Sequence, residues 1–211
     1  MRVIDLSHTI EAGMPCYPGT PAPVFQSLAS LERDGYVEQL ITLSSHTGTH
    51  IDTPSHILPA GPSLDGFGIE SFTGNGVVID LRHVAGGVIT QEMLQPFQPL
   101  LQQSDFVLLS SGWSQYWGSA DYFHGYPTLS LDAAGWLAGF CLKGIGVDMI
   151  SLDGPDSLDF PLHRRLLQSG LILIENLADL SPLLHRSFVF SCFPLKIAGA
   201  EASPTRAVAF V

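Results

Sequence analysis

The chain has 211 residues, of which twenty are acidic and nine are basic, so its formal net charge at pH 7 is −11. A chain of this length buries a substantial core and most simply forms one domain, over residues 1–211, although two small domains would also fit. The acidic surplus argues against a surface for nucleic acid or an anionic membrane, because such surfaces carry clustered lysine and arginine. We therefore expect a small-molecule partner.

The first ten residues, MRVIDLSHTI, place Asp5 and His8 where a signal peptide needs an uninterrupted apolar stretch. No later apolar run approaches the roughly 20 residues that span a bilayer, so we expect a cytoplasmic protein. The three cysteines, Cys16, Cys141 and Cys192, lie far apart without C-x-x-C spacing. Reduced thiols are predicted rather than disulfides or a thiolate zinc site, so any metal should be held by nitrogen and oxygen.

Seven short segments have the composition of β-strands. In chain order they are RVIDLS (2–7), EQLITLSS (38–45), GVVIDL (76–81), FVLLSSG (106–112), GIGVDMIS (144–151), LILIENL (171–177) and SFVFSCFPLKIAG (187–199). Several are almost continuously apolar, which is typical of strands covered on both faces.

Helices are predicted between these segments. The first covers roughly 90–102 and is strained by Pro96; the second covers 130–143; the third covers 161–169, with Gly170 just past its end. This interleaving of strands and helices predicts a mixed α/β domain with a largely buried sheet.

The segment 44–56, SSHTGTHIDTPSH, contains His46, His50, Asp52 and His56. Its glycine, threonine and proline residues suit neither a long helix nor a regular central strand, so a shaped loop is predicted. Wherever the segment is extended, these even-numbered residues lie on one side of the chain. Imidazoles with a carboxylate suit Zn²⁺, Mn²⁺ or Fe²⁺. Surface histidines, or core histidines bonded to backbone carbonyls, are the alternative, but three with an aspartate favour metal.

A second group of interest is His163 on the third predicted helix, followed by Glu175 at the end of the apolar run LILI. A carboxylate buried there requires a cation, a hydrogen-bond donor or solvent. A glutamate at an exposed strand end, paired with an arginine, is equally compatible with the sequence.

The pattern H-x-G-T-H-x-D-x-P-x-H, present as HTGTHIDTPSH, resembles the signature of the metal-dependent "putative cyclase" family, which includes kynurenine formamidase and isatin hydrolase. The run GVDMISLD, followed by His163 and then Glu175, is similar to the family's second motif. Further similarity extends from IDLSHTI and PGTP through VLLSSGWSQYWG to PLKIAGAEASPTRA. The resemblance implies a single α/β domain with a curved, partly barrel-like mixed sheet flanked by helices, of the swivelling β/β/α type, commonly as a homodimer.

The resemblance also implies a centre of two divalent ions, Zn²⁺ or Mn²⁺, whose ligands are His46, His50, Asp52, His163 and Glu175. Asp52 would bridge the ions, and Glu175 would bridge or contact both. A metal-activated hydroxide would then attack an amide, formamide or lactam carbonyl. His56, free of metal, would move the proton to the leaving nitrogen.

Tyr17 precedes Pro18 and Gly19, where the formamidases carry a tryptophan that packs on the aromatic substrate. We therefore expect Tyr17 to contact the substrate, while N-formylkynurenine itself is placed in doubt. The aromatic residues of GWSQYWGSADYFHGYP (112–127) either line a pocket or pack in the core and at interfaces.

The polar residues of VDMISLD (147–153), which are Asp148, Ser151 and Asp153, either orient the ligand histidines or cap a loop. Two other functions remain compatible with the sequence. One is a cyclase or dehydratase that acts on a carbonyl compound, and the other is a metal-binding protein without turnover.

Overall fold

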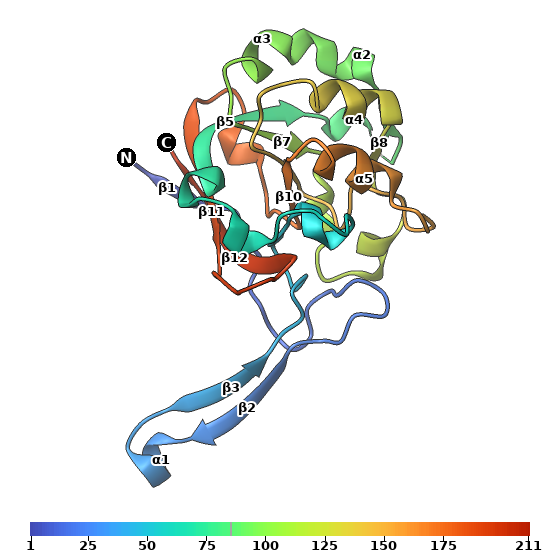
Figure 1. Cartoon of the computed structure of the whole chain (residues 1–211). Helices are drawn as coiled ribbons and strands as arrows, with labels where there is room; N and C mark the ends of the chain where they lie inside the picture. Colours follow the sequence, from blue (N-terminus) through green and yellow to red (C-terminus); the bar gives the residue numbers. More distant parts are fainter. Residues whose placement is uncertain (85) are drawn as a thin grey trace.

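A computed structural model describes residues 1–84 and 86–211. Its main sheet has eight strands in the order β1-β12-β11-β5-β7-β9-β10-β4, and a further pairing of β12 with β4 closes the sheet into a barrel (Figure 1). The strands are β1 (Val3–Asp5), β4 (His50–Asp52), β5 (Thr73–Asp80), β7 (Phe106–Ser110), β9 (Gly144–Val147), β10 (Ile172–Glu175), β11 (Phe188–Pro194) and β12 (Ala202–Phe210). The predicted curved, barrel-like mixed sheet is confirmed.

The barrel is parallel on one side and antiparallel on the other. Strands β5, β7, β9 and β10 run parallel to one another, whereas β4, β11 and β12 pair antiparallel with their neighbours. Every residue of β7, β9 and β10 is buried, as expected for parallel strands covered on both faces.

Alternate residues of each buried strand face two different hydrophobic clusters. Phe106 and Leu108 belong to the cluster that includes Phe190 on β11 and Ala207 on β12. Val107, the residue between them, belongs to the second cluster, which the helices cover. The period of two in a β-strand therefore divides one apolar sequence between two faces of one sheet.

Five short α-helices are present in the described residues: α1 (Leu31–Asp34), α2 (Gln91–Leu94), α3 (Gln98–Leu101), α4 (Leu131–Leu137) and α5 (Pro161–Leu167). The helix predicted over 90–102 is divided between α2 and α3 by a 3-10 turn over Gln95–Phe97. Pro96 explains the interruption, because it has no backbone N–H to donate inside a helix. The helices predicted over 130–143 and 161–169 form, but both are shorter. None of the helices in these described residues is long and apolar enough to cross a membrane.

Five strands differ from the sequence-based expectation. The segment predicted as a shaped loop contains β4, a strand of the closed barrel, so that prediction was wrong for residues 50–52. The final strand β12 and the outer strand β2 (Val24–Ala29) were not predicted. The two-residue strands β6 (Val88–Ile89) and β8 (Thr128–Leu129), which pair with each other in parallel, were not predicted either.

The segment 38–45 was predicted as a strand, but its strand is exposed. Strand β3 (Glu38–Thr42) pairs antiparallel with β2, and Figure 1 shows this hairpin, with α1 at its tip, projecting away from the barrel. Every residue of β3 is exposed, and so is all of β2 except Ala29. We call residues 24–42 the arm.

Replacement of Gly144 by alanine tests the packing of the barrel. A Cβ atom there would lie 2.8 Å from the carbonyl oxygen of Ile172 and 2.7 Å from its Cγ1. We expect Gly144→Ala to lower the free energy of unfolding by about 1–3 kcal/mol, as overpacking does in well-packed interiors. Urea denaturation measures this change.

The matched control is Gly13→Ala, because no atom lies within 4 Å of a Cβ built at Gly13. Its free energy of unfolding should stay within about 0.5 kcal/mol of the parent chain. Equal effects of the two substitutions would contradict close packing around Gly144.

Candidate metal centre

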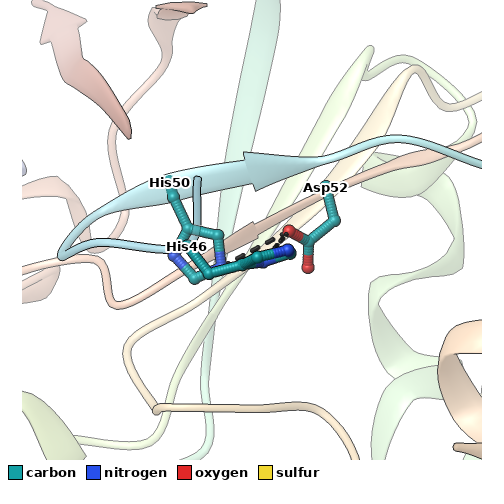
Figure 2. Close-up of side chains that lie close together, drawn as sticks. All are labelled: His46, His50 and Asp52. Atoms are coloured by element: carbon teal, nitrogen blue, oxygen red, sulfur yellow. Dashed lines mark ion pairs between the residues drawn. The ribbon is translucent and has the colours of Figure 1, made fainter. Parts of the chain in front are cut away.

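The centre is built where β4 closes the barrel between β10 and β12. In this register His50 lies opposite Glu175 on β10, and Asp52 lies opposite Ala202 on β12. His50 and Asp52 are two residues apart on the strand, so their side chains project from the same face. His46 reaches this face from the preceding loop, as Figure 2 shows. Strand pairing therefore fixes two predicted ligands and brings a third beside them.

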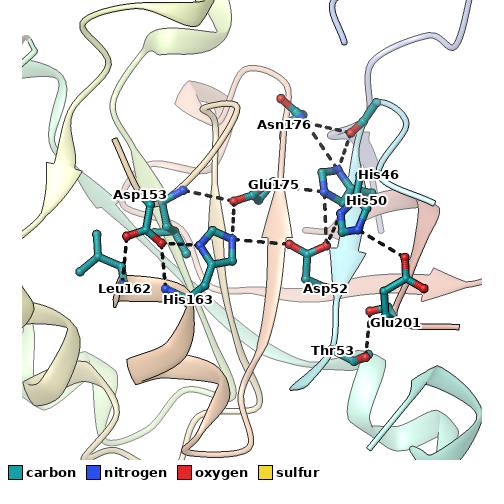
Figure 3. A network of polar contacts seen from close by, with 12 residues as sticks. His46, His50, Asp52, Thr53, Asp153, Leu162, His163, Glu175, Asn176 and Glu201 are labelled. Atoms are coloured by element: carbon teal, nitrogen blue, oxygen red, sulfur yellow. Dashed lines mark hydrogen bonds and ion pairs between the residues drawn. The ribbon is translucent and has the colours of Figure 1, made fainter. Parts of the chain in front are cut away.

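Figure 3 shows that all five predicted ligands converge from four segments of the chain. They form two groups, His46 with His50 and Asp52, and Asp52 with His163 and Glu175, and within each group the ligand atoms lie within 4.8 Å of one another. The carboxylate of Asp52 belongs to both groups. Its Oδ1 is 3.4 Å from Nε2 of His50, and its Oδ2 is 3.7 Å from Nε2 of His163. Glu175 also contacts these two imidazoles, at 3.5 and 3.2 Å.

Three buried polar atoms of this cluster lack hydrogen-bond partners among the described residues. They are Nε2 of His50 and both carboxylate oxygens of Asp52. Nδ1 of His46 is 2.8 Å from Asp52 Oδ1, but the contact does not have hydrogen-bond geometry. A buried carboxylate without a partner is costly, and cations are one of the few groups that offset the cost. This set of nitrogen and oxygen donors fits divalent metal ions.

The charges of the cluster shift the pKa values of its members. Burial alone would lower the pKa of His50, but the charge of Asp52 and a contact with it outweigh burial and raise the pKa to about 9. Burial opposes protonation of His163 as well, yet contacts with Asp153, Asp52 and Glu175 raise its pKa well above the usual value. Asp52 behaves oppositely: burial would raise its pKa, but the charges of His50 and His46 hold it well below the usual range.

The second ring nitrogens of His50 and His163, which point away from the carboxylates of the cluster, each have an acceptor. Nδ1 of His50 lies 2.8 Å from the carbonyl oxygen of Gly48, and Nδ1 of His163 lies 2.6 Å from Oδ2 of Asp153. The Asp153 carboxylate also accepts the backbone N–H groups of Leu162 and His163 at the start of α5. Asp153 therefore orients the ring of His163, a predicted ligand, and also caps a turn.

The other two polar residues of that segment have different positions. Asp148 accepts hydrogen bonds from the hydroxyl and backbone N–H of Ser111 and from the backbone N–H of Gly112. It holds the loop after β7 and does not contact the ligand histidines. Ser151 lies in the wall of the cavity beside the cluster.

His56 lies next to the five residues but belongs to neither ligand group. It ends the 3-10 turn over Pro54–His56, and its ring centre is 4.4 Å from that of His46 and 6.0 Å from that of His163. Burial lowers its pKa below the usual value for histidine, and the charge of nearby Asp52 only partly opposes this. His56 is therefore a neutral imidazole near pH 7, able to accept a proton.

A cavity of about 170 Å³ opens onto the cluster. Its lining includes the polar cluster and, as apolar walls, Tyr17, Ile150 and Phe160. The aromatic residues of 112–127 do not line it; Tyr122 and Tyr126 are buried in the hydrophobic cluster under the helices, and Trp113 packs against that cluster. For these aromatic residues, the core-packing expectation is the one that holds.

Two residues beside the cluster were not identified from the sequence. Asn176 follows Glu175 with a left-handed backbone (φ 57°), accepts a hydrogen bond from the Tyr122 hydroxyl and donates one to the carbonyl of Gly48. Its position directly after the candidate ligand Glu175 could have identified it from the sequence as a neighbour of the cluster. Glu201 lies 3.5 Å from His46, and no sequence pattern pointed to it.

Comparison with known proteins agrees with the geometry. The family described as "Putative cyclase" matches residues 4–154. The chain is 30% identical to the kynurenine formamidase of Salinibacter ruber over 212 residues, which cover 99% of this chain and 97% of that protein.

Two solved structures extend the comparison. Isatin hydrolase A from Labrenzia aggregata bound to benzyl benzoate is 26% identical, with a TM-score of 0.89, and the match covers 100% of this chain and 93% of that one. A structure described as a "Potential Metal-Dependent Hydrolase With Cyclase Activity" is 28% identical with a TM-score of 0.83, covering 99% and 96%.

The chain belongs to the "putative cyclase" family. Its relatives within that family are named kynurenine formamidase and metal-dependent hydrolase, and the chain is accordingly a hydrolase. The alternative of a metal-binding protein without turnover is thereby set aside.

The raised pKa values predict that metal binding releases protons. At pH 7.5 His50, with a pKa of about 9, and His163, with a pKa well above the usual value, are protonated in the metal-free protein. Metal ligation requires neutral imidazoles, so loading should release about two protons per chain, and fewer as the pH rises through about 9. Calorimetric titration with Zn²⁺ in buffers of different ionisation enthalpy measures the release, and identical heats in all buffers would contradict it.

Proposed function

We propose that the two ligand groups hold two divalent ions, Zn²⁺ or Mn²⁺, and that the enzyme hydrolyses a small amide, formamide or lactam. The observation that carries this proposal is the carboxylate of Asp52, which is buried, shared by both groups and without a hydrogen-bond partner among the described residues. His46 and His50 would bind the first ion and His163 the second. Glu175 would bridge the ions or contact both.

Bound divalent ions supply Lewis acidity, which lowers the pKa of water and stabilises the negative charge that develops on a carbonyl oxygen. The protein contributes the position of each ligand. Asp52 and Glu175 supply two negative charges, and Gly48 and Asp153 fix the rings of His50 and His163 through their outward nitrogens. Such outer partners hold ligand rings in one tautomer and raise their basicity.

His56 would carry out the proton transfers. Its neutral imidazole accepts a proton from the attacking water as the new C–O bond forms, and then donates that proton to the nitrogen as the C–N bond breaks. The transfer matters because an amide nitrogen is a poor leaving group as an anion. Its pKa, lowered by burial, keeps the ring in the accepting state near neutral pH.

The cavity indicates a small substrate with an apolar part. Its volume of about 170 Å³ suits a small molecule, and Tyr17 and Phe160 offer aromatic surfaces beside the polar cluster. We propose that Tyr17 packs against an aromatic or cyclic portion of the substrate, so aryl formamides and isatin are the first compounds to test.

Substitution of His56 separates catalysis from metal binding. We expect His56→Ala to keep both ions and to lose about 10²–10⁴-fold in kcat, since general acid–base catalysis is worth that much. His46→Ala and Asp52→Ala should lose metal as well as activity. Metal analysis and turnover of N-formylkynurenine and isatin measure these effects.

The control is His83→Ala, which removes an exposed histidine and should change neither property. A wild-type kcat in His56→Ala would show that the role assigned to His56 is wrong.

We also propose that residues 1–211 act as one domain and that two copies associate through the arm. An isolated two-stranded hairpin is marginally stable in water. Its two faces both carry exposed apolar side chains, because neighbouring strand residues such as Leu40 and Ile41 point to opposite faces. The arm connects the cavity wall at Thr20 to the ligand His46. The surface that covers the arm should therefore be present whenever the site is intact. A second copy of the same chain is always available for this role.

Polar substitutions on the arm test this association. We expect the parent chain to sediment as a homodimer and the double variant Leu40→Ser, Ile41→Ser to sediment as a monomer, because the buried apolar area would be lost. Ile69→Ser is the control, since Ile69 is exposed but lies outside the arm. A monomeric parent chain, or a dimer unaffected by the double variant, would contradict the role of the arm.

A further inference from the structure

Glu201 occupies a fixed position beside the metal centre. It immediately precedes β12, whose first residue, Ala202, lies opposite Asp52 on β4. The backbone carbonyl of Glu201 accepts two hydrogen bonds from Thr53, from its N–H at 2.9 Å and from its hydroxyl at 2.8 Å. These backbone contacts hold the residue in place independently of its side chain.

The carboxylate of Glu201 is directed toward His46. Its Oε1 accepts a hydrogen bond of 2.6 Å from the hydroxyl of Ser45, the residue before this ligand. The same oxygen lies 3.5 Å from Nε2 of His46, while Nδ1 of that ring lies 2.8 Å from Asp52 (Figure 3). The two nitrogens of His46 therefore face two different carboxylates.

The same division is present in the other two ligand histidines. His50 and His163 each turn one nitrogen to the shared carboxylates and the other to an acceptor, Gly48 in one case and Asp153 in the other. Their side chains are only 3% and 4% exposed, whereas that of His46 is 22% exposed. His46 has the least packing to hold its ring and so depends most on an outer acceptor.

We propose that Glu201 is the positioning residue for His46. Its carboxylate accepts the proton of Nε2–H and so selects the tautomer in which the lone pair of Nδ1 faces Asp52 and the first ion. This inference rests on the proposed two-metal function. It also completes the charge balance, because Asp52, Glu175, Asp153 and Glu201 together supply four negative charges against the four of two divalent ions.

The test is metal affinity, measured by competition of Zn²⁺ between the whole protein and a chromogenic chelator. Glu201→Ala should weaken the binding of one of the two ions by about 10–100-fold, which is the usual effect of removing an outer partner, and leave the affinity for the other ion unchanged. Glu201→Gln keeps an amide oxygen as acceptor and should lose less. Ser45→Ala, which frees the carboxylate, should also show a smaller loss at the same ion.

The control for charge is Glu92→Gln on the exposed face of α2, which should leave both affinities at the parent values. Nitrogen NMR of the Zn²⁺-loaded protein gives a second measurement: His46 should carry its proton on Nε2 in the parent chain and lose this preference in Glu201→Ala.

The outcomes separate this inference from the proposed function. Two tightly bound ions in the parent chain, with unchanged affinities in Glu201→Ala, would overturn the role of Glu201 and leave the two-metal centre standing. Equal weakening of both ions would also overturn it, since the effect would then not pass through His46. A parent chain that binds no metal would overturn both proposals.

Discussion

The burial of negative charge at the closure of the barrel is the constraint on which the rest of the structure depends. Asp52 lies on the short strand that joins β10 to β12, and both of its carboxylate oxygens are buried without a hydrogen-bond partner among the described residues. Glu175 lies on the neighbouring strand, buried as well. An arrangement of this kind is stable only with positive charge beside it. The surrounding imidazoles supply that charge when protonated, and divalent ions would replace it in the proposed metal-bound state.

The closure of the barrel also explains why residues so distant in sequence act together. Strand β4 pairs with β10 on one side and β12 on the other, so His50 faces Glu175 and Asp52 faces the start of β12. His163 comes from α5, whose first turn is capped by Asp153. A loss of pairing along β4 would therefore separate both ligand groups at once, which couples folding of the barrel to assembly of the centre.

Part of the candidate site was accessible from the sequence, because His46, His50 and Asp52 lie within one short segment and are residue types that suit a divalent ion, whereas His163 and Glu175 were assigned through the family resemblance. The apolar strands β7, β9 and β10 were equally clear, since their sequences carry almost no polar residues. Strand β4 was not recognised, because glycine, threonine and proline around it are typical of loops and its pairing partners lie more than a hundred residues away. Glu201 was missed for the same reason: only the register between β4 and β12 brings it to His46.

Strand β3 of the arm was predicted, but its exposure was not, because exposure depends on what the rest of the chain leaves uncovered. The helix split by Pro96 shows the opposite case, in which a local rule decided the structure. Local chemistry therefore predicted the type of several elements and some of the side chains that could hold a metal, whereas long-range strand pairing decided which side chains meet.

The most direct test of the central claim is the metal content per chain of protein purified without chelator, combined with turnover before and after the metal is stripped and restored. The account predicts about two divalent ions per chain and hydrolysis of a small amide or formamide that disappears with the metal and returns with it. A folded protein without stoichiometric metal would contradict the account.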